Sequence, residues 1–201
     1  MVRIKVCGLR RPEDILLSSN VADELGFVLE PTSPRFLSAP ESVDRDPLSG
    51  RVTFAVYGPL PSSLPEPLFD RVQFIPEFSQ PLLEALKGRH RPVVRPTSET
   101  DWGLIRAWLA ESDSTEVILD PFHKDAYGGT GKRLDDRLIE AFRAEISLPL
   151  VIAGGLTPEN VADVIRRHHP WGVDVSSGIE ASPGVKDHQK LRAFVEAVRS
   201  A

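Results

Sequence analysis

Two side chains that can exchange protons stand at the ends of short apolar segments. Cys7 follows "RIKV" (3–6), and Asp120 follows "EVIL" (116–119). A thiolate can accept a proton, and a carboxyl group whose pKa is raised by burial can donate one. Each residue also has a plain alternative, because a lone cysteine is often a small core residue and an aspartate can cap a loop.

Glycine and serine end the last two apolar segments of the chain. "LPLVIAGG" (148–155) ends in Gly154 and Gly155, and "WGVDVSSG" (171–178) ends in Ser176, Ser177 and Gly178. Backbone N–H groups that carry little side-chain bulk can surround a phosphate group. Glycines at these positions can also serve only to make tight turns. Because two consecutive loops share the feature, the pattern favours a phosphate site.

These residues need a scaffold that brings strand ends together. Eight short segments rich in β-branched residues alternate with stretches of helical spacing, which predicts a parallel sheet of the α/β class. An open doubly wound sheet and a closed (β/α)8 barrel both fit, and eight strands favour the barrel. No G-x-G-x-x-G motif follows the first segment, which argues against a dinucleotide-binding sheet. The predicted strands span residues 3–8, 25–30, 51–57, 71–75, 92–96, 116–120, 148–155 and 171–178.

The predicted barrel occupies residues 1–201 as a single domain, but its helical layer is uneven. Amphipathic helices are predicted over 135–145, 157–167 and 187–200. Thr157 fits the N-cap of the second helix, Pro158 fits its first helical position, and Asp187 opens the third. Prolines interrupt the segments after the second and third strands, so we expect shortened or irregular helices there.

Alternation along the strands indicates which side chains face the barrel interior. In the eighth strand, Val173 and Val175 suit the surrounding helices, so Asp174 and Ser176 should face inward. The same alternation in the first and sixth strands gives an inward-facing set that should converge on one pocket: Lys5, Cys7, Asp120, Asp174 and Ser176.

Charge, hydropathy and cysteine content restrict the class of protein. The formal net charge of -5 argues against nucleic acid or an anionic membrane as the main partner. No apolar run reaches the roughly 18 residues of a membrane span, and the N-terminus predicts a strand rather than a signal peptide. The single cysteine cannot form an internal disulfide, which favours a reducing cytoplasm. Four histidines show no metal-ligand spacing and should be surface residues, so no metal is expected: His123, His168, His169 and His188.

Several motifs together resemble one enzyme family, the phosphoribosylanthranilate isomerases of tryptophan biosynthesis. The resemblance runs from residue 4 to about residue 195 and implies a barrel without metal or organic cofactor. It implies conversion of N-(5-phosphoribosyl)anthranilate to 1-(2-carboxyphenylamino)-1-deoxyribulose 5-phosphate, an Amadori rearrangement. The motifs occur in the family's order: "KVCGL" (5–9), "GFVLEPTSPRFLS" (26–38), "YGGTGK" (127–132), "AGGLTPENV" (153–161) and "VDVSSGIEASPGVKDHQKL" (173–191).

The resemblance implies roles for individual residues. Cys7 matches the family's general base and Asp120 its general acid, while Arg35 matches the partner of the anthranilate carboxylate. Asp174 should lie close to the sugar. The residues of "YGGTGK" also suggest a nucleotide-binding loop, but the first glycine of a P-loop is missing at the right distance, so we expect a mobile loop over the pocket. The phosphate cradle should comprise Gly154, Gly155, Ser176, Ser177 and Gly178.

The chain departs from the family pattern after two predicted strands. Gln73 is present, but Ile75 and Pro76 stand where the family usually carries His and Gly. The fifth segment, "PVVRP" (92–96), lacks the lysine expected near its end. We therefore expect the chemistry to persist with an altered fit of the substrate.

Two other functions remain open at the level of sequence. One is a related sugar phosphate isomerase of histidine biosynthesis, which usually works with two aspartates and is disfavoured by Cys7. The other is a non-catalytic phosphate-binding barrel. For each of the two enzymes, the expected partner is a phosphosugar substrate, and the expected assembly is a monomer or a homodimer.

Overall fold

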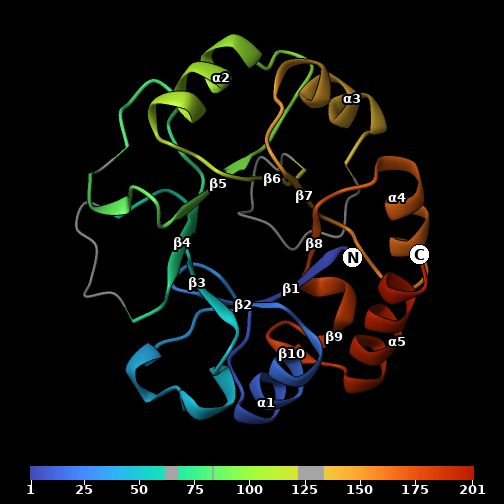
Figure 1. Cartoon of the computed structure of the whole chain (residues 1–201). Helices are drawn as coiled ribbons and strands as arrows, with labels where there is room; N and C mark the ends of the chain where they lie inside the picture. Colours follow the sequence, from blue (N-terminus) through green and yellow to red (C-terminus); the bar gives the residue numbers. More distant parts are fainter. Residues whose placement is uncertain (62–67, 83, 122–133) are drawn as a thin grey trace.

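A closed parallel barrel forms the centre of the computed structural model, which describes residues 1–61, 68–82, 84–121 and 134–201. Each strand pairs with the next, and the last returns to the first (Figure 1). The predicted (β/α)8 architecture is therefore confirmed. The strands are β1 (Arg3–Cys7), β2 (Glu24–Val28), β3 (Val52–Val56), β4 (Arg71–Phe74), β5 (His90–Val94), β6 (Val117–Leu119), β7 (Leu150–Ala153) and β8 (Gly172–Val175).

The alternation predicted from the sequence holds in β1 and β8. Lys5 is the register partner of Asp174, and their side chains meet inside the barrel. Ile4 and Val173 face the helices and are fully buried in the main hydrophobic core. A separate apolar cluster packs inside the barrel: Ile75, Val93, Ile118, Val151 and Ala153.

Helices cover the barrel from β5 round to β1. Three of them begin at an aspartate whose side chain accepts from backbone N–H groups of the first turn, and Asp187 among these was predicted. The apolar faces expected from the sequence are buried, for example Ile139 with Phe142 and Leu191 with Phe194. The helices are α1 (Pro12–Val21), α2 (Trp102–Glu111), α3 (Asp136–Glu145), α4 (Val161–His168) and α5 (His188–Arg199).

The start of α4 differs from the prediction. The helix begins at Val161 with Asn160 at the N-cap position, whereas the sequence favoured Thr157 and Pro158. The amide of Thr157 donates to Oδ1 of Asn160 at 2.9 Å, and Nδ2 of Asn160 donates to the carbonyl of Gly155 at 2.8 Å. The Asn160 side chain thus holds the loop after β7 in a turn and delays the helix.

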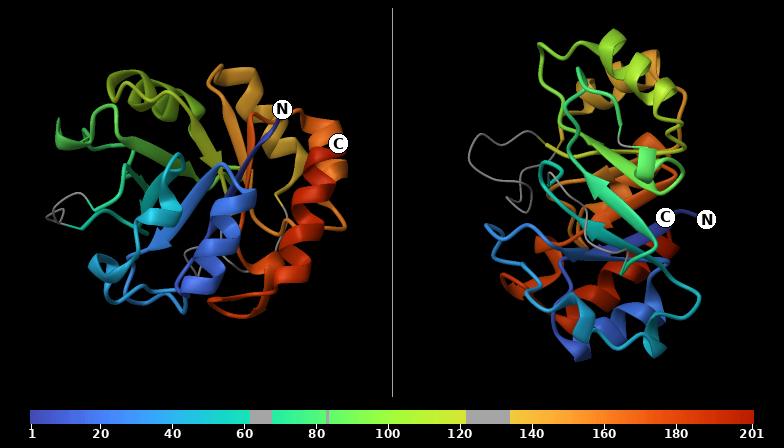
Figure 2. Two further views of the ribbon diagram at one scale, coloured as in Figure 1. Left: turned by 60° about the horizontal axis from the view of Figure 1, so that its bottom comes forward. Right: turned by 90° about the vertical axis from the view of Figure 1, so that its left-hand side faces the viewer.

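The helical layer is thin beside β2, β3 and β4. Within the described ranges, only two short 3-10 helices follow β2, namely η1 (Pro40–Ser42) and η2 (Asp46–Leu48). Only η3 (Glu84–Leu86) follows β4 in the same ranges, a shortening that the sequence did not predict. Figure 1 and the right-hand view of Figure 2 show this flank with few helices over the strands.

A hairpin that the sequence did not predict follows β8. The chain passes through η4 (Ser177–Ile179) into β9 (Glu180–Ser182) and β10 (Val185–Lys186), and Gly184 makes the turn with φ of 78°. The amide of Lys186 donates at 3.0 Å to Asp14, a fully buried residue of α1. The hairpin therefore lies fixed beside α1 and α5 (Figure 1).

Buried ion pairs fill the end of the barrel where the strands begin. Arg91 is fully buried and pairs with Glu24 at 2.5 Å and with Glu116 at 2.6 Å. Arg3 and Arg71 pair with the same two carboxylates from the sides. Because these residues stand at or near the amino ends of their strands, this Arg91 cluster lies at the end of the barrel away from the strands' carboxyl ends.

The two ends of the chain lie side by side (Figures 1 and 2). Arg199 donates to the carbonyl of Val2 at 3.4 Å and pairs with Asp23 at 3.4 Å. Both contacts involve residues just before β1 and β2, so the termini lie at the same end of the barrel as the Arg91 cluster.

Some predictions concern features that the structure does not describe. The "YGGTGK" segment (127–132) and His123 lie outside the described residues. Within the described ranges, no helix combines the length and apolar character needed to cross a membrane.

Candidate active site

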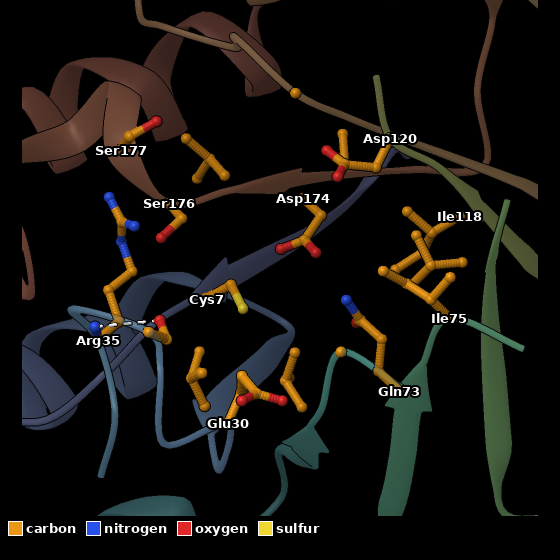
Figure 3. A pocket seen from close by; sticks show the side chains of 18 of the residues that line it. Cys7, Glu30, Arg35, Gln73, Ile75, Ile118, Asp120, Asp174, Ser176 and Ser177 are labelled. Atoms are coloured by element: carbon orange, nitrogen blue, oxygen red, sulfur yellow. Dashed lines mark hydrogen bonds between the residues drawn. The ribbon is translucent and has the colours of Figure 1, made fainter. Parts of the chain in front are cut away.

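The carboxyl ends of the strands surround one pocket, opposite the Arg91 cluster. Figure 3 shows Cys7, Asp120 and Asp174 pointing into the same space. Strand alternation therefore identified residues that do meet. Two predicted residues, Gly178 and Lys5, do not line the pocket. The other predicted site residues do: Cys7, Arg35, Asp120, Gly154, Gly155, Asp174, Ser176 and Ser177.

Cys7 and Lys5 share the space beside a glycine of β2. A Cβ atom on Gly26 would lie 2.8 Å from Sγ of Cys7 and 2.9 Å from Nζ of Lys5. Both distances are shorter than an ordinary van der Waals contact, so any larger residue would displace the thiol or the ammonium group. Glycine at position 26 leaves room for the two groups side by side, and of the two Cys7 lines the pocket.

The pKa of Cys7 lies above that of an ordinary thiol. Burial raises it most, Lys5 lowers it, Asp174 raises it, and Lys186 lowers it again. The charge of Lys5 favours the thiolate. Burial outweighs it, so the thiol is mostly protonated at neutral pH.

Asp174 joins this group through an ion pair. Nζ of Lys5 donates to Oδ2 of Asp174 at 2.9 Å, and both side chains are buried. In the described part of the chain, Oδ1 of Asp174 and Oε1 of Gln73 are buried without a hydrogen-bond partner. Buried acceptors without donors are costly, which suits a ligand that brings hydroxyl groups into the pocket.

Asp120 directly follows β6 and has the electrostatic setting of an acid. Burial raises its pKa to about 6, the charge of Arg95 lowers it, and that of Asp174 raises it. Nε of Arg95 lies 3.7 Å from Oδ2 of Asp120. The predicted upward shift is confirmed, and Arg95 stands near the end of β5, where the expected lysine is missing.

The glycines after β7 and β8 include residues that make tight turns and one that fits a phosphate site. A Cβ on Gly154 would lie 2.0 Å from Cδ of Pro121, and one on Gly178 would lie 1.8 Å from the carbonyl oxygen of Leu156. Close packing alone therefore explains these two residues. Gly155, with φ of 63°, keeps an amide that has no acceptor among the described residues, as an anion site requires.

Arg35 is buried and is therefore not a solvated surface charge. Its Nε and Nη2 donate to the carboxylate of Glu180 at 2.9 and 2.6 Å, in a fork. A Cβ on Gly8 would lie 2.6 Å from Cδ of Arg35, so glycine at position 8 gives the side chain its path into the pocket.

Other residues in the pocket escaped the sequence reasoning. Glu30 and Tyr57 line it and stand just beyond the ends of β2 and β3. The rule that functional residues follow barrel strands would have found both. Ile75 also lines the pocket and packs against the inner apolar cluster. An apolar contact therefore stands where the family pattern has a histidine.

Among the described histidines, His169 and His188 are exposed, as predicted, whereas His90 and His168 are buried. His168 is buried and pairs with Asp136 at 3.0 Å, so its prediction as a surface residue is wrong. His188 pairs with Asp14 at 2.8 Å. No group of His, Cys, Asp and Glu with metal-binding geometry occurs in these ranges.

Comparison with known proteins gives one consistent family. The family model of N-(5'-phosphoribosyl)anthranilate (PRA) isomerase matches residues 82–197. The N-(5'-phosphoribosyl)anthranilate isomerase of Pseudomonas fluorescens is 37% identical over 98% of each chain.

Solved structures agree with this match. Phosphoribosyl anthranilate isomerase from Thermotoga maritima superposes with a TM-score of 0.79 at 30% identity, covering 100% of each chain. A phosphoribosyl anthranilate isomerase in complex with reduced 1-(o-carboxyphenylamino)-1-deoxyribulose 5-phosphate gives a TM-score of 0.76 at 29% identity, again over 100% of each chain.

Proposed function

Because the chain belongs to the N-(5'-phosphoribosyl)anthranilate isomerase family, it is an isomerase of tryptophan biosynthesis, and we propose that Cys7 is its general base and Asp120 its general acid. The reaction converts an aminoaldose into an aminoketose. It requires one group that gives a proton to the furanose ring oxygen and one that removes a proton from C2. The single observation that carries the proposal is that both side chains line one pocket from β1 and β6.

Asp120 suits the ring-opening step. A carboxyl group with a pKa of about 6 is still partly protonated near neutral pH and can give its proton to the ring oxygen. As the C1–O bond breaks, the nitrogen lone pair forms an iminium ion with C1. Asp120 becomes a carboxylate, and the nearby guanidinium of Arg95 stabilises that charge.

Cys7 suits the second proton transfer. Its thiolate form takes the proton from C2, and the electrons of the C–H bond move to the iminium and leave an enolamine, which tautomerises to the ketone. The iminium makes the C2 proton more acidic, so a small thiolate fraction is sufficient. Lys5 and Lys186 favour the thiolate by their charges.

The two anionic ends of the substrate have separate recognition groups in this proposal. The amide of Gly155 and the hydroxyls of Ser176 and Ser177 bind the phosphate, with Gly154 and Gly178 shaping the loops. Arg35 binds the anthranilate carboxylate through the N–H groups that Glu180 does not use. Asp174 accepts from a sugar hydroxyl through its unpaired Oδ1.

Turnover measured by the fluorescence of the anthranilate derivative tests the two proton-transfer roles. Cys7→Ala should lose at least about a hundredfold in kcat while a product analogue still binds. Asp120→Asn should lose kcat with an unchanged melting temperature. More than about a tenth of the wild-type kcat in Cys7→Ala would exclude the base role. A loss confined to KM in Asp120→Asn would make Asp120 a binding residue.

The alternatives open at the level of sequence are less well supported. A sugar phosphate isomerase of histidine biosynthesis usually relies on two aspartates, whereas β1 ends in Cys7. A non-catalytic barrel would need neither the thiol nor a carboxyl group with a raised pKa. The family match over most of the barrel favours the tryptophan reaction over both.

The setting of the enzyme is also a proposal. We infer a single-domain monomer or homodimer that works in the reducing cytoplasm, where its one cysteine stays a thiol. The acid and the base both come from the chain, so the reaction as written calls for no cofactor. Light scattering on the purified protein would decide between monomer and homodimer.

A further inference from the structure

A lysine from the hairpin after β8 reaches the end of β1 inside the protein. Lys186 is 3% exposed, and its Nζ donates to the backbone carbonyl of Cys7 at 2.6 Å. The same ammonium group donates to Oε1 of Glu180 at 2.9 Å and lies 3.4 Å from both oxygens of Ser176. It therefore connects the ends of the two strands that carry the proposed base and a proposed phosphate-binding serine.

Glu180 shares one carboxylate between two cations. It accepts the fork from Arg35 and the bond from Lys186, and its Oε1 also accepts from the amide of Gly184 at 3.3 Å. One negative and two positive side chains leave this group with a net charge of +1 (+2 − 1). An excess positive charge beside the pocket suits a substrate that carries both a phosphate and a carboxylate.

Stability alone does not account for this arrangement. Burial lowers the pKa of Lys186, and the charge of Glu180 raises it. Burying charged groups is costly even when they are paired, and apolar residues of similar volume often give equal or greater stability. A buried lysine that binds the backbone of the proposed base therefore fits a positioning role better than a structural one.

The thiol of Cys7 responds to few charged groups. Lys5 and Asp174 face it from inside the barrel, and Lys186 faces it from the hairpin. Lys5 is already paired with Asp174, whereas Lys186 is paired with the residue that also holds Arg35. Lys186 and Glu180 thus link the base to the site proposed for the anthranilate carboxylate.

We propose that Lys186 and Glu180 are positioning residues of the isomerase, with Lys186 fixing Cys7 for proton removal and Glu180 fixing Arg35 for binding of the carboxylate. The inference rests on the roles proposed above for Cys7 and Arg35. It divides the kinetic consequences: loss of Lys186 acts mainly on kcat, and loss of Glu180 acts mainly on KM.

The role of Lys186 can be tested by alkylating the single cysteine with iodoacetamide. Mass spectrometry follows the reaction over a series of pH values. The pH at which alkylation is half-maximal is the alkylation midpoint. In Lys186→Met this midpoint should rise by about half a pH unit or more, because a positive charge is lost beside the thiol. The kcat should fall about tenfold or more, in line with a misplaced reacting group. The control is Lys190→Met. Lys190 is exposed, and its ammonium group donates to the backbone carbonyl of Glu180 at 3.1 Å, so its loss should change neither the midpoint nor kcat.

A conservative variant separates positioning from packing. Lys186→Arg keeps the charge and should retain more kcat than Lys186→Met, with a midpoint near that of the wild type. A space-filling role predicts the opposite order, because Met is closer to Lys in volume than Arg is. If melting curves show that Lys186→Met does not fold, Lys186→Gln, which keeps N–H donors without the charge, takes its place with the same expectation.

The variant Glu180→Gln tests whether Glu180 fixes Arg35 for binding of the carboxylate. KM should rise about tenfold while kcat stays within about threefold, because Arg35 loses its charge-assisted fork. A wild-type alkylation midpoint and kcat in Lys186→Met, or an unchanged KM in Glu180→Gln, would overturn the inference. The variants Cys7→Ala and Arg35→Ala keep the two proposals apart. If they retain activity, the assigned roles fail, while the alkylation midpoint still reports whether Lys186 acts on the thiol.

Discussion

Gly26 carries no side chain at the point where the thiol of Cys7 and the ammonium group of Lys5 approach β2. Gly26→Ala places a methyl group within 3 Å of both, so at least one must move. We expect kcat to fall about tenfold to a hundredfold with the fold retained, because displacement by about an ångström is enough to lose that much rate. Steady-state kinetics and a melting curve provide the measurement.

The matched control adds the same methyl group elsewhere. In Gly103→Ala, in the first turn of α2, the nearest atom would be Oδ1 of Asp101 at 3.3 Å. This variant should keep its kcat and have an equal or higher melting temperature, because alanine favours the helix. Equal activity of the two variants would mean that Cys7 and Lys5 adjust without cost.

In the proposed mechanism, the protonation states of Cys7 and Asp120 set the pH range of activity. The reactive form would have a proton on Asp120 and none on Cys7. Between the two pKa values it would make up a constant fraction of the singly protonated pair. With Asp120 near 6 and Cys7 raised, kcat/KM should rise through about pH 6 and fall only in the alkaline range.

Arg95 provides the test of that assignment. Its charge lowers the pKa of Asp120, so Arg95→Met should raise that pKa and move the acid limb of kcat/KM to higher pH. Arg106→Met, which removes an exposed ion pair with Glu145, is the control and should leave the limb in place. An acid limb that does not move in Arg95→Met would assign it to another group.

The sequence predicts which strand side chains face the pocket, because strand alternation decides it. It does not predict the partners of residues whose contacts lie far away in the chain. Asp174 and Cys7 face the pocket because the strand repeat of two puts them there. The ion pair of Arg35 with Glu180 joins positions 145 residues apart, and no short-range pattern announces it. Lys186 was overlooked for the same reason, although it stands inside the motif that identified the family.

At the scale of elements, apolar periodicity located the strands and most helices but not their ends. The start of α4 was predicted too early. Two hydrogen bonds of the Asn160 side chain hold residues 155–160 in a turn, so the helix begins only after Asn160. The β9–β10 hairpin was missed because its stability comes from Asp14 of α1 and from the Arg35 pair. Tertiary contacts decide such elements, and propensity does not.

The thin flank of the barrel should differ from the helical flank in dynamics. Residues 36–51 carry only η1 and η2, whereas α5 packs Leu191 and Phe194 fully into the core. Amide hydrogen exchange followed by mass spectrometry should therefore be faster over 36–51 than over 188–199, because fewer buried contacts oppose local opening. Equal protection of the two segments would show that the short helices are as firmly held as α5.

Across the whole molecule, the pocket and the Arg91 cluster lie at opposite ends of the barrel, and we call the end with the Arg91 cluster the structural end. At the structural end, burial would raise the pKa of Glu24, but Arg91 and Arg3 lower it below its usual value. A carboxyl group with a lowered pKa in the folded state adds stability above its unfolded pKa of about 4.3. That contribution is lost as the pH falls through the folded value, so the free energy of unfolding should decrease below about pH 4.

Arg91→Met should destabilise the protein by about 3–5 kcal/mol at pH 8, because Glu24 and Glu116 lose a shared buried partner. The loss should be smaller at pH 5, where the stranded carboxyl groups more readily take up protons. Urea unfolding at both pH values measures it. Arg167→Met, which breaks an exposed pair with Asp163, should cost less than about 1 kcal/mol at either pH. A loss in Arg91→Met independent of pH would contradict the role of the buried carboxylates.

The neighbouring chain ends also determine how the protein can be attached to other objects. Val2 and Arg199 are in contact at the end of the barrel away from the pocket. A tag at either terminus therefore extends from the end opposite the pocket. Molecules grafted to a bead or an electrode through such a tag would all present the open mouth of the barrel to the solution. Either terminus serves equally well, and the choice of anchor leaves the route of the substrate free.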